Sequence, residues 1–178
     1  MLRGTLRNVY LMLREYDLAV AEAEAVVTAN PLVGGHWELL GHTLVAAARG
    51  LLEKGDPAAA RAYLERARSL PEEMAAAEAR LNREVAYGRR AIDRPPGVVL
   101  ATGQAEYLLG RYPEAVTLLD RARRQQAPAA EVLVWLAAAH ARQGHPDRAG
   151  SLLAEAERAD GKARDRYREI VALGPVGA

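Results

Sequence analysis

Residues 110–119 read Gly-Arg-Tyr-Pro-Glu-Ala-Val-Thr-Leu-Leu, and residues 144–153, which lie 34 positions later, read Gly-His-Pro-Asp-Arg-Ala-Gly-Ser-Leu-Leu. In both stretches a proline follows shortly after the glycine. Glycine readily adopts the left-handed conformation that ends a helix, and proline suits the first turn of the next helix. A turn repeated at this period is typical of stacked helical hairpins, whose concave faces serve as binding surfaces. The two stretches therefore predict an all-α array.

Other positions recur with the same period, and together they resemble the tetratricopeptide repeat. The copy numbered from Pro96 matches the family pattern at Val99, Thr102, Gly103, Gly110, Tyr112, Ala115, Leu119 and Ala122. The copy numbered from Ala130 matches it at Leu133, Leu136, Ala137, Gly144, Ala149, Leu153 and Ala156. Two earlier copies carry Leu6, Tyr10, Tyr16 and Ala19, and then Trp37, Leu40, Gly41 and Ala60. Two positions depart from the pattern, because Glu106 stands where the family has tyrosine and Arg14 where it has glycine.

The resemblance implies an all-α fold, namely a right-handed α-solenoid of antiparallel helical hairpins with about ten helices in a single domain over residues 1–178. We expect helices near residues 2–14, 17–29, 34–54, 57–69, 72–92, 97–109, 113–126, 129–143, 146–159 and 161–173. Residues 1–70 would form an N-terminal repeat pair and residues 97–160 a C-terminal pair, with an extra helix and linker over residues 71–96 between them. Residues 161–178 would be a capping helix with a polar surface, followed by a tail.

The composition excludes several classes of protein. The chain has 178 residues, 50% of them hydrophobic, with no cysteine and a formal net charge of +1. Without cysteine there is no disulfide, thiolate nucleophile or thiolate metal ligand, which is in keeping with the cytoplasm. No run of about 18 apolar residues could span a membrane, and so small a net charge gives no overall attraction to nucleic acid. We therefore expect a cytoplasmic protein whose partner is another protein or a peptide.

The resemblance also names a candidate peptide-binding groove. In this family the first helix of each hairpin lines a concave face, and the matching residues here are Leu100, Gln104, Tyr107, Leu108, Val134, Trp135, Ala138 and Arg142. The Lys and Asn clamp that holds a C-terminal carboxylate in some members is matched only by Asn8. A mostly apolar groove suits an amphipathic helix or a hydrophobic peptide. Alternatively, Tyr107 and Trp135 pack between adjacent hairpins, because aromatic side chains often belong to the core.

A second hypothesis places the binding surface on the expected helix 72–92. The residues that recur at spacings of three and four along one face of that helix are Arg80, Arg83, Tyr87, Arg90 and Arg94. Arginines beside an aromatic ring could hold phosphates while the ring stacks on a base, so this hypothesis invokes nucleic acid or another anionic partner. Alternatively, the arginines form a solvated face that is balanced by Glu72, Glu84 and Asp93.

The sequence does not assemble a recognisable catalytic or metal site. His36, His42, His140 and His145 fall in pairs six and five residues apart, and neither spacing places two ligands on one helical face. No serine lies in a nucleophile-elbow context, and no phosphate-binding glycine loop is present. We therefore predict no enzymatic activity, no metal and no cofactor. A third hypothesis is a structural module that associates with itself as a homo-oligomer.

Overall fold

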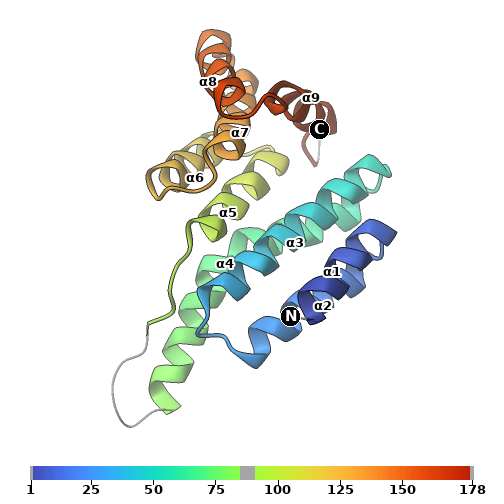
Figure 1. The fold of residues 1–178 in the computed structure, drawn as a ribbon, viewed down its shortest axis with the longest axis vertical. Coiled ribbons are helices and arrows are strands. Elements are labelled where there is room, and N and C mark those ends of the chain that lie inside the picture. The colour runs from blue at the N-terminus through green and yellow to red at the C-terminus, as the bar shows by residue number, and fades with distance from the viewer. Residues whose placement is uncertain (1, 85–90, 177–178) are drawn as a thin grey trace.

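The computed structural model describes residues 2–84 and 91–176, and within these ranges the chain forms helices and loops with no strand (Figure 1). The helices are α1 (Leu2–Leu13), α2 (Tyr16–Ala29), α3 (Gly34–Glu53), α4 (Pro57–Glu84), α5 (Pro96–Leu108), α6 (Tyr112–Arg124), α7 (Ala129–Arg142), α8 (Pro146–Ala159) and α9 (Ala163–Leu173). None of these described helices is both long enough and apolar enough to cross a bilayer.

Consecutive helices pair as hairpins, α1 with α2, α3 with α4, α5 with α6 and α7 with α8. Each hairpin then packs on the next one, and α9 ends the array against α7 and α8. Figure 1 shows the hairpins side by side, from α1 at one end to α8 at the other. A single hairpin cannot bury its own apolar stripe, so this stacking supplies the core. The expected all-α solenoid of helical hairpins is confirmed.

The four hairpin turns share one backbone conformation. Gly55, Gly110 and Gly144 have φ of 77°, 80° and 79°, and Arg14 has φ of 62° at the position where the family has glycine. The amide of the following residue then bonds to the carbonyl five residues back, for example from Arg111 to Glu106 at 2.8 Å. This bond satisfies a carbonyl that the helix end leaves without a partner. The repeat therefore sets the same turn four times, even where glycine is missing.

One helix, α4, is longer than the sequence pattern predicts. The pattern predicts separate helices over residues 57–69 and 72–92, but one helix runs from Pro57 to Glu84 and contains Pro71. The prediction of a break is wrong because an apolar stripe continues across the proline, with the buried members Ala60, Leu64, Ala67, Leu70 and Met74. Residues 71–84 are therefore the second half of a hairpin helix and not an extra helix between two repeat pairs.

The proline is tolerated where α4 packs on α5. Pro71 has no amide hydrogen to donate to the carbonyl of Ala67. The hydroxyl oxygen of Thr102, on α5, lies 3.4 Å from that carbonyl oxygen and 2.9 Å from the carbonyl oxygen of Val98. Thr102 is itself buried. The gap in the α4 hydrogen-bond ladder thus faces a polar group of the neighbouring helix, and the helix continues.

Helices α3, α4 and α5 meet closely at Gly41, one of the residues that match the repeat pattern. A Cβ added at Gly41 would lie 2.9 Å from Cβ of Ala101 on α5 and 3.1 Å from Cδ1 of Leu70 on α4. Both neighbours are fully buried, so neither can move away without shifting a helix. The missing side chain of Gly41 therefore sets the spacing of the three central helices.

Replacing Gly41 with alanine is expected to destabilise the protein by about 1–3 kcal/mol, because the added methyl group overpacks this crossing. The matched control is Gly150→Ala on α8, where a Cβ would meet nothing within 4 Å. There the higher helix propensity of alanine should stabilise the protein by about 0.5–1 kcal/mol. Equilibrium unfolding in urea measures both changes. A Gly41→Ala variant as stable as the control would show that the three helices are not in close contact.

Glu106, the residue that replaces the tyrosine of the family pattern, is buried on α5 with 6% of its surface exposed. Its carboxylate lies 3.6 Å from Arg111, which also lies 3.4 Å from Glu65 on α4. Burial raises the pKa of Glu106, and the nearby Arg111 opposes that effect only in part. Because the folded state favours the protonated carboxyl, this group contributes stability at low pH, and the contribution is lost as the pH rises through its folded-state pKa.

Glu106→Gln is therefore expected to raise the melting temperature at pH 8, where the wild-type carboxyl is both ionised and buried. The gain should shrink as the pH falls toward 4.5, the ordinary pKa of a glutamate, because the wild-type group then takes up its proton. Thermal unfolding across this pH range measures the difference. Glu72→Gln, at an exposed position on α4, is the control. A gain that does not change with pH would contradict the assignment.

Candidate functional site

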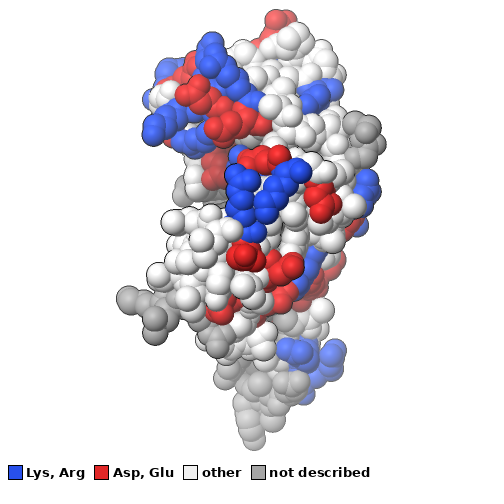
Figure 2. Space-filling model, turned by 90° about the vertical axis from the view of Figure 1, so that its right-hand side faces the viewer, with Lys and Arg blue, Asp and Glu red and all other residues white. Residues whose placement is uncertain are grey.

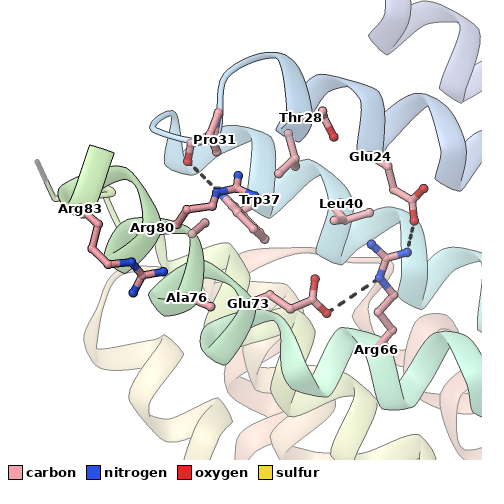
Figure 3. Close-up of a pocket in the computed structure, with 12 residues that line it drawn as sticks. Glu24, Thr28, Pro31, Trp37, Leu40, Arg66, Glu73, Ala76, Arg80 and Arg83 are labelled. Carbon is pink, nitrogen blue, oxygen red and sulfur yellow. Dashed lines mark hydrogen bonds and ion pairs between the residues drawn. The ribbon is translucent and has the colours of Figure 1, made fainter. Parts of the chain in front are cut away.

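A cleft of about 520 Å³ opens between α2, α3 and the second half of α4 (Figure 3). Its lining residues are Glu24, Val27, Thr28, Pro31, Trp37, Leu40, Arg66, Glu73, Ala76, Ala77, Arg80 and Arg83. The last five of these belong to the part of α4 that follows Pro71. The unexpected continuation of α4 therefore builds one whole wall of the cleft.

The floor of the cleft is apolar and buried. Trp37 and Leu40 on α3 are 4% and 1% exposed, and Val27 on α2 is 8% exposed. The indole N–H of Trp37 donates to the carbonyl oxygen of Pro31 at 2.8 Å, which fixes the ring against the loop between α2 and α3. Because the only polar atom of the indole is already satisfied, the small part of the ring that faces the cleft is apolar.

An ion-pair network crosses one end of the cleft from α2 to α4. Arg66 on α4 pairs with Glu24 on α2, and its guanidinium lies 3.9 Å from Glu73 further along α4. Figure 3 shows this guanidinium between the two carboxylates. The hydroxyl of Ser69 also donates to Glu73, at 2.9 Å. Both carboxylates thus have partners within the protein. The charges at this end of the cleft therefore neutralise one another.

At the other end of the cleft, Arg80 and Arg83 stand about one turn apart on α4. Both side chains are exposed, and neither forms an ion pair or a hydrogen bond with any described residue. Figure 3 shows Arg80 reaching toward Trp37, while Arg83 points outward. Two positive charges that have no partner among the described side chains therefore flank an apolar floor.

The arginine face predicted for residues 72–92 is only partly present. Its first two members stand at the cleft mouth, but Arg94 lies in the loop that leads to α5 and pairs with Glu78 at 3.6 Å. Arg94 cannot extend a helical face, because the loop is not helical there. Arg90 and Tyr87 lie outside the described residues. The predicted stripe thus contributes two arginines to the cleft and one to an internal ion pair.

The groove predicted on α5 and α7 is not an open surface in the described part of the chain. The residues that are at most 3% exposed are Leu100, Gln104, Tyr107, Leu108, Val134, Trp135 and Ala138. Only Arg142 is exposed, and it donates to the carbonyl of Val171 at 2.7 Å. The amide of Gln104 donates to Glu131 at 2.8 Å. These side chains therefore pack between helices, as the second interpretation of the sequence holds.

Helices α3 and α9 close this side of the array. The long helix α3 packs along α5, while α9 packs on α7 and also reaches α3. The rings of Tyr107 and Trp135 meet edge to face with their centroids 5.4 Å apart, and the guanidinium of Arg49 lies 5.9 Å from the Trp135 ring centroid. Arg49 also pairs with Glu169 of α9 at 3.8 Å. A cavity of about 230 Å³ remains between α3, α7 and α9.

Charged side chains on the face drawn in Figure 2 are mixed in sign, with Lys and Arg beside Asp and Glu. Several ion pairs join neighbouring helices, such as Arg123 with Glu155 at 2.6 Å and Arg111 with Glu65 at 3.4 Å. Exposed pairs of this kind contribute little to stability, but they cancel the local field. Among the described residues on this face, no extended basic patch offers itself to a nucleic acid backbone.

The four histidines do not form a metal site in the described ranges, where no three His, Cys, Asp or Glu side chains are grouped as ligands. His140 and His145 do lie together across a hairpin turn, with ring centroids 5.9 Å apart. Burial lowers the pKa of His140, and the nearby Arg148 adds to the effect. His140 is therefore biased toward its neutral form.

Sequence patterns pointed to Trp37 only as a repeat residue and did not indicate the cleft. The signal was nevertheless present, because Glu73, Ala76, Arg80 and Arg83 recur at spacings of three and four. That spacing has meaning only if one helix continues through Pro71, and the proline suggested a break. Once the helix is known to be continuous, these four residues fall on one face, opposite α2 and α3.

Val134→Arg is expected to unfold the protein or to lower its stability by more than about 4 kcal/mol, because the new charge would be buried between helices. Ala154→Arg, at an exposed position on α8, is the control and should change stability by less than about 0.5 kcal/mol. Circular dichroism during thermal unfolding measures both. A Val134→Arg variant as stable as the control would show that the predicted groove on α5 and α7 is open in solution.

Comparisons with known proteins agree with this architecture. Residues 100–164 match the family model of the tetratricopeptide repeat. The structure is similar to the crystal structure of a thermophilic tetratricopeptide-repeat protein of Thermus thermophilus, with a TM-score of 0.67 and 22% sequence identity over 96% of this chain and 80% of that chain. A search of curated proteins finds no match. Residues 100–164 therefore match the tetratricopeptide repeat, and the described ranges have the fold of a tetratricopeptide-repeat protein.

Proposed function

We propose that this protein is a non-enzymatic, cytoplasmic interaction scaffold that binds a peptide or amphipathic helix of another protein in the α2–α3–α4 cleft. Helical repeats of this kind commonly act through extended binding surfaces. The observation that supports the proposal is the cleft itself, in which a buried apolar floor with Trp37 lies beside Arg80 and Arg83, which have no partner among the described side chains. At the surface on α5 and α7 only a cavity of about 230 Å³ remains, because α3 and α9 close that side of the array.

The cleft favours a segment that carries an apolar side chain next to acidic ones. Burying a side chain the size of leucine or phenylalanine against Trp37 and Leu40 would contribute about 1.5–3 kcal/mol. Arg80 and Arg83 are three residues apart on α4, so they match two carboxylates that are one turn apart on a partner helix. Guanidinium groups hold carboxylates through paired hydrogen bonds, which would also fix the orientation of the segment.

The two tryptophans of the chain allow a direct test, because Trp37 lines the cleft and Trp135 lines the cavity between α3, α7 and α9. Peptides selected on the wild-type protein from a random display library are added to Trp135→Phe, which keeps only the cleft tryptophan, and to Trp37→Phe. We expect the peptides to change the emission of Trp135→Phe and to leave that of Trp37→Phe unchanged. A response of Trp37→Phe alone would place the site in the other cavity and contradict the proposal.

The role of charge is tested with Arg80→Glu/Arg83→Glu, which is expected to weaken binding of the selected peptides about tenfold or more, because attraction becomes repulsion at two positions. The matched control is Arg121→Glu/Arg124→Glu on α6, which has the same spacing, the same exposure class and the same change in charge. Fluorescence anisotropy of labelled peptides measures the affinities. Equal weakening by the two double variants would show a general effect of net charge and not a site at the cleft.

Self-association is a second candidate function, favoured by the surface of α1. Its exposed apolar side chains are Leu6 (41%), Val9 (41%), Met12 (81%) and Leu13 (65%). An apolar row of this kind at one end of the array suits contact with a second copy of the chain. Sedimentation equilibrium over a range of concentrations tests this candidate, and a monomer at every concentration would remove it.

A further inference from the structure

The chain turns back on itself after α9. Gly174 has φ of 66° and ψ of 166°, a conformation that is essentially restricted to glycine, and it directs the following residues onto the ends of α4 and α5. Figure 1 shows the segment that follows α9 near the upper ends of α3 and α5. Val176 is only 5% exposed. The short segment Gly174–Val176 is therefore docked on the array.

Two hydrogen bonds hold the backbone of Val176. Its amide donates to the carbonyl oxygen of Leu108 at 2.8 Å, and its own carbonyl oxygen accepts from the guanidinium of Arg61 at 3.0 Å. Pro175 packs against Gly110, where an added Cβ would lie 3.3 Å from the proline Cβ. One residue of the segment is thus recognised through its N–H, its C=O and its side chain together.

The groups that hold the segment belong to α4 and α5 and not to α9. Leu108 is the last residue of α5, so its carbonyl has no partner within that helix. Arg61 lies in the first turns of α4 and extends from an exposed position. Backbone hydrogen bonds of this type bind a peptide chain whatever its sequence, while the buried position of one side chain selects for an apolar residue.

We propose that the slot formed by Arg61, Leu108 and Gly110 is a second peptide-binding site, which takes a short apolar segment of another protein and is occupied here by Gly174–Val176. The slot lies at the N-terminal end of α4, whereas the cleft of the proposed function lies along the C-terminal half of that helix. The two sites therefore share no lining residue. An incoming segment would take the place of Val176 and use the same two hydrogen bonds.

The docked segment competes with any segment that arrives from outside. A segment tethered by a short linker faces its site at an effective concentration in the millimolar range. The apparent affinity for an external peptide falls in proportion to the fraction of molecules in which the slot is already filled. Weakening the internal segment should therefore strengthen the binding of an external one, which is the opposite of what a purely structural tail would do.

The test uses the full chain and a fluorescent peptide with the sequence of residues 171–176. Val176→Asp should release the internal segment, because a carboxylate is not tolerated in the buried position. We expect anisotropy to show that the peptide binds this variant at least about tenfold more tightly than it binds the wild type. Adding Arg61→Ala to the same chain should abolish the gain, because the acceptor carbonyl of the peptide loses its donor.

The matched control is Ala172→Asp, which adds the same charge at an exposed position of α9 and should bind the peptide as weakly as the wild type does. Equal affinity of Val176→Asp and the wild type would overturn the proposal, and so would a gain that survives Arg61→Ala. The emission of Trp37 in Trp135→Phe should not respond to this peptide. Failure of the slot is thus distinguishable from failure of the cleft.

A second variant keeps the proposal testable if Val176→Asp does not fold. Arg61→Ala in the otherwise wild-type chain removes one of the two bonds to Val176 and changes an exposed position of α4. Amide hydrogen exchange at Val176 is expected to become about tenfold faster, while the melting temperature stays close to that of the wild type. Unchanged exchange at Val176 would show that Arg61 does not hold the segment, and the slot would be rejected.

Discussion

A single buried stripe along α4, from Ala60 through Leu64 and Leu70 to Met74, packs on α3 and on α5. Because this stripe does not stop at Pro71, the helix cannot stop there either without exposing Met74. The three central helices are then fixed at close range by Gly41, which has no side chain to separate them. The second half of α4 projects beyond this crossing and forms a wall opposite α2 and α3. The cleft is therefore a consequence of how the core is packed.

The local parts of this fold were predictable from the sequence. Gly110 and Gly144 predict turns, and the structure gives both a left-handed backbone, with the same conformation at Arg14 where the pattern is broken. Hairpin pairing follows from the period, since short loops leave consecutive helices side by side. The predicted helix break at Pro71 was wrong because a proline destabilises only the turn that contains it, whereas burial of the apolar stripe stabilises the whole helix.

The site was harder to predict than the fold. Tyr107 and Trp135 stand at positions that line an open groove in the family, but here α3 and α9 cover them. Nothing in the local pattern shows that α9 returns to α3, or that Val176 reaches Leu108, because these contacts join residues far apart in sequence. In the same way, Trp37 and Arg80 meet only through the tertiary packing of α3 on α4. Periodicity predicts which faces are apolar but not which of those faces remain uncovered.

In this helical array the side formed by α5 and α7 is closed by α3 and α9, and the open cleft lies elsewhere, between α2, α3 and the second half of α4. The most direct measurement is residue-resolved hydrogen exchange of the protein with and without a bound protein segment. We expect added protection in α2 and in residues 73–83 of α4, with α5 and α7 unchanged. Protection confined to α5, α7 and α9 would contradict it and would return the binding surface to the concave face.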